Sequence, residues 1–334
     1  MYLDKGELGI GRTVITIAGQ IGSGKSAVCR QLHQQTNWEV ISAGAIMRRA
    51  ATRSGMSILQ MNEYATSHSE IDAEVDNYLI SLRKGINSII VDSRLAWHFI
   101  PSSLKVYLVV DPYVGAQRIF EATRVDEKYP SVEIAYADSI ERQRLETERY
   151  MELYSVDCQS WHNYHVIIDT THASPEQTAA LILNKVKRFQ NDELYSPECW
   201  LSPKRLMPTK KLPEITGHRM VSVRDKSSRQ EYDMKRLVDI GVFKGFYFII
   251  KGHRRVSAAI INNESLVRCR LIAFESEEIS PGLSLESVAT TSTSLLLTHH
   301  WEETNGFRFV SYPSWLAEGQ QLTAKPPLEK DHLE

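Results

Sequence analysis

The segment GQIGSGKS at residues 19–26 matches the pattern G-x-x-x-x-G-K-S, with an apolar, β-rich run before it (13–18) and a helix-like segment after it (27–35). Glycines let a backbone wrap closely around phosphate, and a helix that begins there adds N–H groups and a positive dipole end. The lysine then supplies a mobile cation, and the serine hydroxyl a ligand for Mg²⁺. The motif predicts a site for a nucleoside triphosphate made of Gly19, Gly22, Ser23, Gly24, Lys25 and Ser26, in which Lys25 also serves catalysis and Ser26 binds the metal. By itself it leaves open whether the chain is a kinase, an ATPase or a GTPase.

Strand-like and helix-like segments alternate along residues 12–189. Apolar, β-rich runs occur at 13–18, 38–41, 88–91, 105–110 and 165–168. The intervening and following segments have helical patterns, at 27–35, 46–51, 58–66, 73–84, 113–122, 134–154 and 176–189. This alternation predicts an α/β fold, a doubly wound parallel sheet of five strands with helices on both faces.

Two arginines follow strands of this predicted sheet. Arg48 falls one turn into the helix after the second strand, and Arg94 closes the sequence Asp92-Ser93-Arg94 after the third. Both would emerge at the carboxyl edge of the sheet, where doubly wound folds bind ligands. A guanidinium grips phosphate oxygens bidentately, so the pair suits a phosphorylated acceptor. Either arginine taken alone also suits a surface salt bridge.

The segment 142–150 (RQRLETERY) is rich in arginine. Arg142, Glu146 and Arg149 stand at i, i+4 and i+7, which is one face of a helix. One interpretation is a lid that brings cations to a migrating phosphoryl group and excludes water. The other is a solvated, salt-bridged helix. Phosphoryl transfer depends chiefly on positioning and charge neutralisation, so arginines without an evident general base favour a kinase.

Residues 13–182 resemble the cytidylate kinase-like family of nucleoside monophosphate kinases, especially its short, archaeal-type branch. The matching stretches are ITIAGQIGSGKSAV, VISAGAIMRR, GMSILQMNEYA, VDSRLAWHFIP, VYLVVDP, RQRLETERYMELYSVD and VIIDTTHASPEQ, in the family's order. The resemblance implies a P-loop kinase that uses ATP and Mg²⁺, with residues 22–26 on the ATP phosphates. Residues 58–82 would form the small helical segment that binds the monophosphate.

The same resemblance assigns roles to the arginines. It implies that Arg48 and Arg94 grip the acceptor phosphate, that Arg142 and Arg149 act catalytically from the lid, and that Glu146 holds an acceptor hydroxyl. Asp92 is assigned to the same substrate site, either assisting Mg²⁺ or orienting Arg94. Gln143 stands where the family usually has an acidic residue.

A second unit is predicted after a polar, proline-containing linker at 190–198. It spans 199–316, follows the first unit at 12–189, and precedes a tail at 317–334 that we expect to be disordered. A strand pattern at 246–250 leads into a helix-like segment at 254–261. Gly252, His253, Arg254 and Arg255 lie between them and predict a phosphate site at a helix start. The alternative is a basic helix start exposed to solvent.

The stretch GHRRVSAA at 252–259 resembles the G-[EH]-R-R-x-x-A-A box of the ParB and sulfiredoxin-like superfamily, and residues 206–209 (LMPT) look like that fold's entry strand. The resemblance implies a small α+β domain that binds a second nucleotide or DNA. His253 stands where sulfiredoxin would need its cysteine, which counts against peroxiredoxin repair.

Composition limits the partners. The formal net charge of -2 gives no electrostatic footprint for nucleic acid. The four cysteines are scattered singly, so neither a zinc site nor a disulfide framework is expected. No apolar run approaches the roughly 18 residues of a membrane span, and we expect a cytoplasmic protein without a membrane partner.

Three functions fit these observations. The leading one is phosphoryl transfer from ATP to a small-molecule nucleotide, CMP or dCMP, giving CDP or dCDP. The second is a P-loop kinase for another small metabolite, since the same arginines would serve it. The third is a nucleotide-responsive regulator whose ParB-like unit binds DNA.

Overall fold

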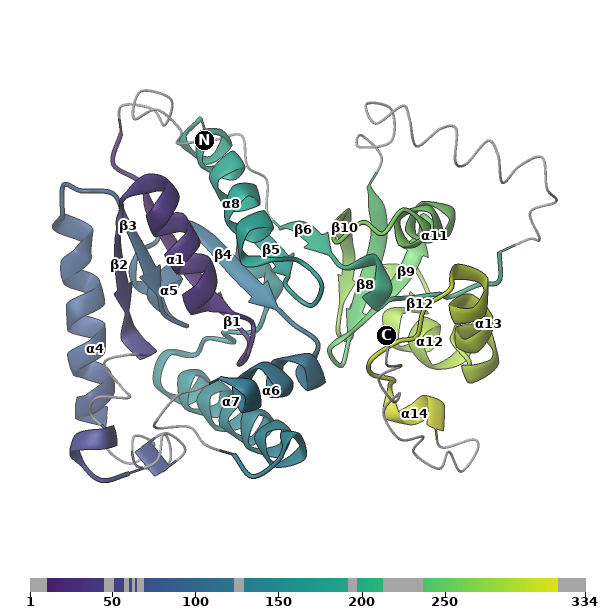
Figure 1. Cartoon of the computed structure of the whole chain (residues 1–334), viewed down its shortest axis with the longest axis horizontal. Helices are drawn as coiled ribbons and strands as arrows, with labels where there is room; N and C mark the ends of the chain where they lie inside the picture. Colours follow the sequence, from purple (N-terminus) through teal and green to yellow (C-terminus); the bar gives the residue numbers. More distant parts are fainter. Residues whose placement is uncertain are drawn as a thin grey trace, which may run out of the picture.

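The computed structural model describes residues 11–44, 51–56, 60–61, 64, 69–122, 129–191, 197–212 and 237–317. Below, residues 11–191 are the N-terminal half and residues 197–317 the C-terminal half. Figure 1 shows the two halves side by side, and strands β5 (Val166–Asp169) and β6 (Glu198–Leu201) of one sheet pair where the halves meet.

The N-terminal half contains the five predicted strands. They are β1 (Val14–Gly19), β2 (Glu39–Ser42), β3 (Ile89–Asp92), β4 (Leu104–Val109) and β5 (Val166–Asp169), all parallel, in the order β2-β3-β1-β4-β5. Their runs are almost continuously apolar because a parallel sheet is covered on both faces. The predicted α/β fold with a parallel sheet is confirmed.

Helices cover both faces of this sheet. The main ones are α1 (Lys25–Thr36), α4 (Ser69–Ser81), α5 (Ala96–Phe99), α6 (Pro112–Glu121), α7 (Val132–Tyr154) and α8 (Pro175–Gln190), with short 3-10 turns at Leu82–Lys84 and Trp161–Asn163. One face packs on α1 and α8, and the other on α4, α5 and α7. The helices predicted at 46–51 and 58–66 lie mostly outside the described residues.

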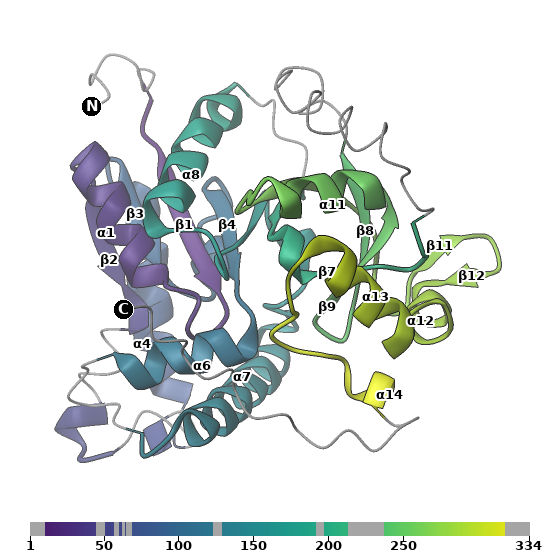
Figure 2. The ribbon, with the colours of Figure 1, turned by 45° about the vertical axis from the view of Figure 1, so that its right-hand side comes forward.

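Side chains fix where several of these helices begin. Asp111 accepts hydrogen bonds from the first backbone N–H groups of α6, and Ser131 does so for α7. At α8, Ser174 and Gln177 form a reciprocal capping box in front of Pro175. Figure 2 shows α6 and α7 lying across the end of the sheet at which β1 and β4 finish.

The C-terminal half adds further strands and helices. It comprises β6 (Glu198–Leu201), a 3-10 turn (Pro203–Arg205), β7 (Leu206–Met207), β8 (Val238–Phe243), β9 (Phe246–Lys251), α11 (His253–Ile261), β10 (Val267–Phe274), β11 (Glu278–Ser280), β12 (Leu283–Ser284), α12 (Leu285–Ser287), a π-helical turn (Val288–Ser292), α13 (Leu295–Asn305) and α14 (Ser314–Ala317). The strand and helix predicted at 246–250 and 254–261 are confirmed.

One ten-stranded sheet runs through both halves. Strand β6 pairs in parallel with β5, where Val166 lies opposite Glu198, and antiparallel with β10 on its other side. The order then continues β10-β8-β9-β7. Gln190 of the predicted linker ends α8 and Glu198 begins β6, while residues 192–196 lie outside the described part. The division into domains at 12–189 and 199–316 stays a prediction. So does the disordered tail at 317–334, of which only Ala317 is described.

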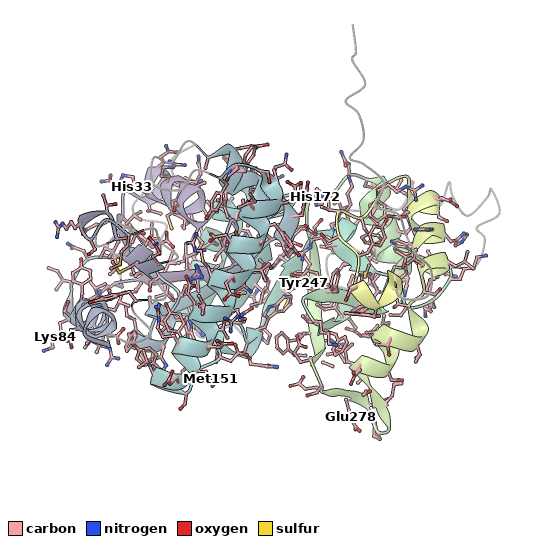
Figure 3. The ribbon with its side chains drawn as sticks, turned by 90° about the horizontal axis from the view of Figure 1, so that it is seen from below. His33, Lys84, Met151, His172, Tyr247 and Glu278 are labelled. Carbon is pink, nitrogen blue, oxygen red and sulfur yellow. The ribbon has the colours of Figure 1, made fainter. Side chains whose placement is uncertain are left out.

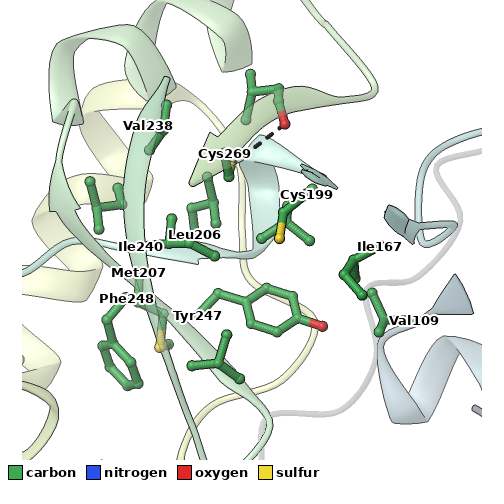
Figure 4. Packing of buried hydrophobic residues seen from close by; sticks show 14 of the residues in the cluster. Val109, Ile167, Cys199, Leu206, Met207, Val238, Ile240, Tyr247, Phe248 and Cys269 are labelled. Carbon is green, nitrogen blue, oxygen red and sulfur yellow. Dashed lines mark hydrogen bonds between the residues drawn. The ribbon is translucent and has the colours of Figure 1, made fainter. Parts of the chain in front are cut away.

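A hydrophobic core is shared between the halves. Val109 and Ile167 of the N-terminal half belong to the same buried cluster as Leu206, Tyr247 and Phe248 of the C-terminal half (Figure 4). All four cysteines are buried and unbonded to one another. Among the described helices, none has the length and apolar character needed to cross a bilayer.

Candidate active site

The glycine-rich loop, residues 19–24, joins β1 to α1 as the motif predicts. Gly22 and Gly24 have φ of 74° and 76°, and Gly24 directly precedes α1. A Cβ on Gly19 would lie 2.3 Å from the carbonyl oxygen of Leu108, and one on Gly22 would lie 2.3 Å from that of Gly115. The loop is therefore packed against β4 and α6, and only glycine fits at both places.

Lys25, the first residue of α1, is held at this loop. Its Nζ donates hydrogen bonds of 2.9 Å to the carbonyl oxygens of Gly19 and Gln20. Burial and, to a smaller extent, Arg94 lower its pKa to about 8, against the opposing influence of Asp92 and Glu146. The partly buried ammonium group thus lies among charges of both signs.

Two hydroxyls meet the carboxylate of Asp92 at the end of β3. The hydroxyls of Ser26 and Ser42 each donate a hydrogen bond of 3.4 Å to Oδ2 of Asp92. Hard oxygen ligands of this kind suit Mg²⁺, which commonly binds one or two protein ligands together with phosphate oxygens and water. The Ser26 hydroxyl and the Asp92 carboxylate therefore fit the metal that the motif predicts.

Arg94 lies opposite the long helix α7. Its Nε is 2.5 Å from Glu146 Oε2. Burial, the largest single influence, would lower the pKa of Arg94, but Glu146 together with smaller contributions, the first from Tyr150, raises it. The partner of Glu146 in this structure is therefore Arg94, a pairing that the sequence did not indicate.

Helix α7 carries charged residues on two faces, one buried in the protein and one exposed to solvent. Arg142, Glu146 and Arg149 are 5–6% exposed. Arg142 lies 3.8 Å from Asp138, and Arg149 stacks 5.2 Å from the ring of Tyr150. The solvated, salt-bridged interpretation is wrong for these three residues. It holds instead for Arg144, which is exposed and pairs with Glu141 and Glu148.

A small hollow opens between the end of β1 and α7. It is lined by Ala18, Gly19, Arg94, Tyr107, Gln143, Thr147, Cys158 and Gln159. Gln143 donates to Gln159, which donates in turn to Thr147, both at 2.6 Å. The wall beside Arg94 is therefore neutral and can both donate and accept hydrogen bonds. Sequence reasoning missed Gln159 because no motif marks it.

The remaining predicted site residues that the structure describes belong to the C-terminal half. Arg48 lies outside the described residues. In the C-terminal half, Arg254 is exposed, whereas Arg255 donates to the carbonyl of Leu237. His253 is 2% exposed, and its Nε2 accepts from the backbone N–H of Thr209 at 3.1 Å. Burial lowers the pKa of His253 to about 4, so the ring is neutral.

Comparison with known proteins connects this geometry to a family. The profile of the "Cytidylate kinase-like family" matches residues 14–172. The cytidylate kinase of Thermoplasma volcanium is 34% identical over 189 residues, which span 55% of this chain and 96% of that protein. The chain belongs to the cytidylate kinase-like family. It is a phosphotransferase with a P-loop kinase fold.

A second cytidylate kinase is similar to the same part of the chain. The cytidylate kinase of Pyrococcus abyssi is 35% identical over 173 residues, which span 52% of this chain and 92% of that protein. Among solved structures, the shikimate kinase of Bacteroides thetaiotaomicron has 14% identity and a TM-score of 0.37, over 54% of this chain and 98% of its own. The family match ends at residue 172, so the ParB-like resemblance of 199–316 stays a prediction.

Proposed function

We propose that the chain transfers the γ-phosphoryl group of ATP to CMP or dCMP. The main support for this proposal is the buried face of α7, on which Arg142 and Arg149 flank Glu146, the partner of Arg94. Membership in the cytidylate kinase-like family, and relatives named cytidylate kinase, favour a cytidine acceptor.

In the proposed reaction an oxygen of the acceptor phosphate forms a bond to the γ-phosphorus while the bond to the β–γ bridging oxygen breaks, which releases ADP. Lys25 and the glycine-rich loop hold the ATP phosphates. Arg48 and Arg94 hold the acceptor phosphate, and Arg142 and Arg149 neutralise charge on the migrating group. Mg²⁺ bound near Ser26 and Asp92 would supply further charge neutralisation.

The base of the acceptor is proposed to lie against the neutral wall of Gln143, Thr147 and Gln159. A side-chain amide offers both a donor and an acceptor, as the N3 and N4 edge of cytosine requires. This arrangement would also explain why an acidic residue is dispensable at position 143.

Two arginines on the same helix provide the test. Arg149→Ala should lower kcat by at least about 100-fold, because a positioned cation at the reacting phosphate is removed. Arg144→Ala, five residues away on the solvent face, should leave kcat within about twofold. The assay is ADP release from Mg²⁺-ATP and CMP by the full chain. Equal effects of the two changes would refute the role given to the buried face.

A second nucleotide site is proposed at the start of α11, favoured by His253, whose buried Nδ1 has no hydrogen-bond partner among the described residues. The helix terminus and the exposed Arg254 would attract a phosphate group. Calorimetry on the Lys25→Met chain should still detect one bound CTP or ATP, and Arg254→Ala should abolish it. Retention of that binding in the double variant would refute the site.

A further inference from the structure

Asp169, the last residue of β5, is a carboxylate completely enclosed by the protein. Its exposed fraction is 0%. Oδ1 accepts hydrogen bonds from the backbone N–H and the hydroxyl of Thr171, at 2.9 and 2.6 Å. Oδ2 faces the C-terminal half, where it accepts from the backbone N–H of Ser202 and from Arg205, each at 3.3 Å. A buried carboxylate needs such a compensating cation.

Arg205 supplies that cation from the C-terminal half. Its side chain is 10% exposed. It donates to the hydroxyl of Tyr247 at 3.2 Å and stacks 4.5 Å from that ring. Burial opposes its charge, but Tyr247, Asp169 and Asp111 raise its pKa. Figure 3 shows Tyr247 and His172 near the boundary between the two halves.

Hydrogen bonds connect the two residues that follow Asp169, Thr170 and Thr171, to the surroundings of the glycine-rich loop. Thr170 donates through its hydroxyl to the carbonyl oxygen of Ser23 at 3.0 Å. Thr171 accepts from the backbone N–H of Asp111 at 2.9 Å. Asp111 caps α6, and Gly115 of that helix lies against Gly22. Thr170 therefore contacts the loop directly, and Thr171 contacts it through Asp111 and helix α6.

A second contact from the C-terminal half reaches the same place. Ser311 donates to Asp111 Oδ1 at 3.0 Å. Two segments far apart in the sequence, around 202–205 and 311, thus hold the ends of β4 and β5 from one side. The match to the family profile ends at residue 172, so both segments lie beyond it.

We propose that Arg205 is a positioning residue for the donor nucleotide. Acting through Asp169, Thr170 and Thr171, it holds the glycine-rich loop in the shape that receives the phosphates, so that the C-terminal half completes the donor side of the kinase site. The inference rests on the proposed function only for donor binding at this loop and is independent of the acceptor.

The test is the affinity of the full chain for Mg²⁺-ADP, measured by calorimetry without an acceptor. Arg205→Met should raise the dissociation constant about tenfold, the size of effect expected for coupling through a packed network. Arg270→Met is the matched control, because Arg270 is an exposed arginine of the same half that also pairs with an aspartate, Asp239. It should change the dissociation constant by less than about twofold.

Two further variants distinguish an effect of Arg205 on the glycine-rich loop from a general loss of folding. Asp169→Asn combined with Arg205→Met should recover part of the lost affinity, because no charge is then left buried alone. Ser311→Ala removes one hydrogen bond and should weaken binding about two- to threefold in a chain that remains folded. Unchanged Mg²⁺-ADP affinity in folded Arg205→Met and Ser311→Ala chains would overturn the proposal. If the wild-type chain does not bind Mg²⁺-ADP, both the role of Arg205 and donor binding at this loop are refuted. If the wild-type chain binds Mg²⁺-ADP but does not phosphorylate CMP, only the proposed acceptor is refuted.

Discussion

The surroundings of Lys25 make its ammonium form easier to deprotonate than that of an ordinary lysine. Burial, helped by Arg94, brings its pKa down to about 8, well below the ordinary lysine value. Two loop carbonyls are its hydrogen-bond acceptors. Phosphate oxygens arriving at the glycine-rich loop would favour the charged form and raise the pKa again.

This shift predicts that nucleotide binding takes up a proton above pH 8. At pH 9 Lys25 is largely neutral in the unliganded protein and becomes charged when phosphates bind, whereas at pH 7 it is charged in both states. Calorimetry of Mg²⁺-ADP binding in buffers of different ionisation enthalpy should report uptake at pH 9 that is larger than at pH 7. Affinity should fall as the pH rises through 8. Equal proton uptake at both values would contradict the shift.

Site residues that belong to a contiguous motif could be predicted from the sequence. Ion pairs between residues far apart in the sequence could not. The glycine-rich loop is a contiguous pattern, so its residues could be predicted. Glu146 pairs with Arg94, and Asp169 with Arg205, across long stretches of chain. Neither pairing has a local signal, because each depends on where strands and helices end in space.

The loop between β1 and α1 shows how an element depends on its neighbours. Its glycines are needed for positive φ and also for close approach to β4 and α6. Strand prediction succeeded for β1 to β5 because both faces of a parallel sheet are apolar. It failed for β8 and β10, where Asp239 and Arg270 interrupt the apolar runs and pair with each other across the two strands.

Replacing Gly22 by alanine tests the packing of this loop. The added Cβ would meet the backbone of Gly115 and would sit at an unfavourable φ of 74°. We expect a strain of about 1–3 kcal/mol, with weaker Mg²⁺-ADP binding as the loop shifts. Gly11→Ala, which meets nothing within 4 Å, is the control. Normal nucleotide affinity in Gly22→Ala would show that the loop tolerates the displacement.

The whole molecule is held together by a shared sheet and a shared core. Strand β6 lies between β5 and β10, and the largest buried cluster takes residues from both halves. The sequence suggested two units because the strand–helix alternation stops near residue 190. It gave no sign that β6 continues the sheet, since a strand of four residues that begins at Glu198 lacks a clear apolar pattern.

A chain that ends at residue 191 should therefore be less stable than the full chain. It would expose Val109, Tyr107 and Ile167, which are now buried in the shared cluster, and leave Asp169 without Arg205. Thermal melting should show a lower midpoint or aggregation. The same midpoint and the same Mg²⁺-ADP affinity as the full chain would contradict a dependence between the halves.

The most direct test of the proposed kinase activity is ADP release by the full chain from Mg²⁺-ATP with a panel of ribo- and deoxynucleoside monophosphates, with product analysis for the diphosphate. We expect turnover of CMP or dCMP to CDP or dCDP well above that of the other monophosphates, and its loss in Lys25→Met. Binding of ATP without turnover of any monophosphate would contradict the proposed acceptor, and the kinase site would then serve another metabolite.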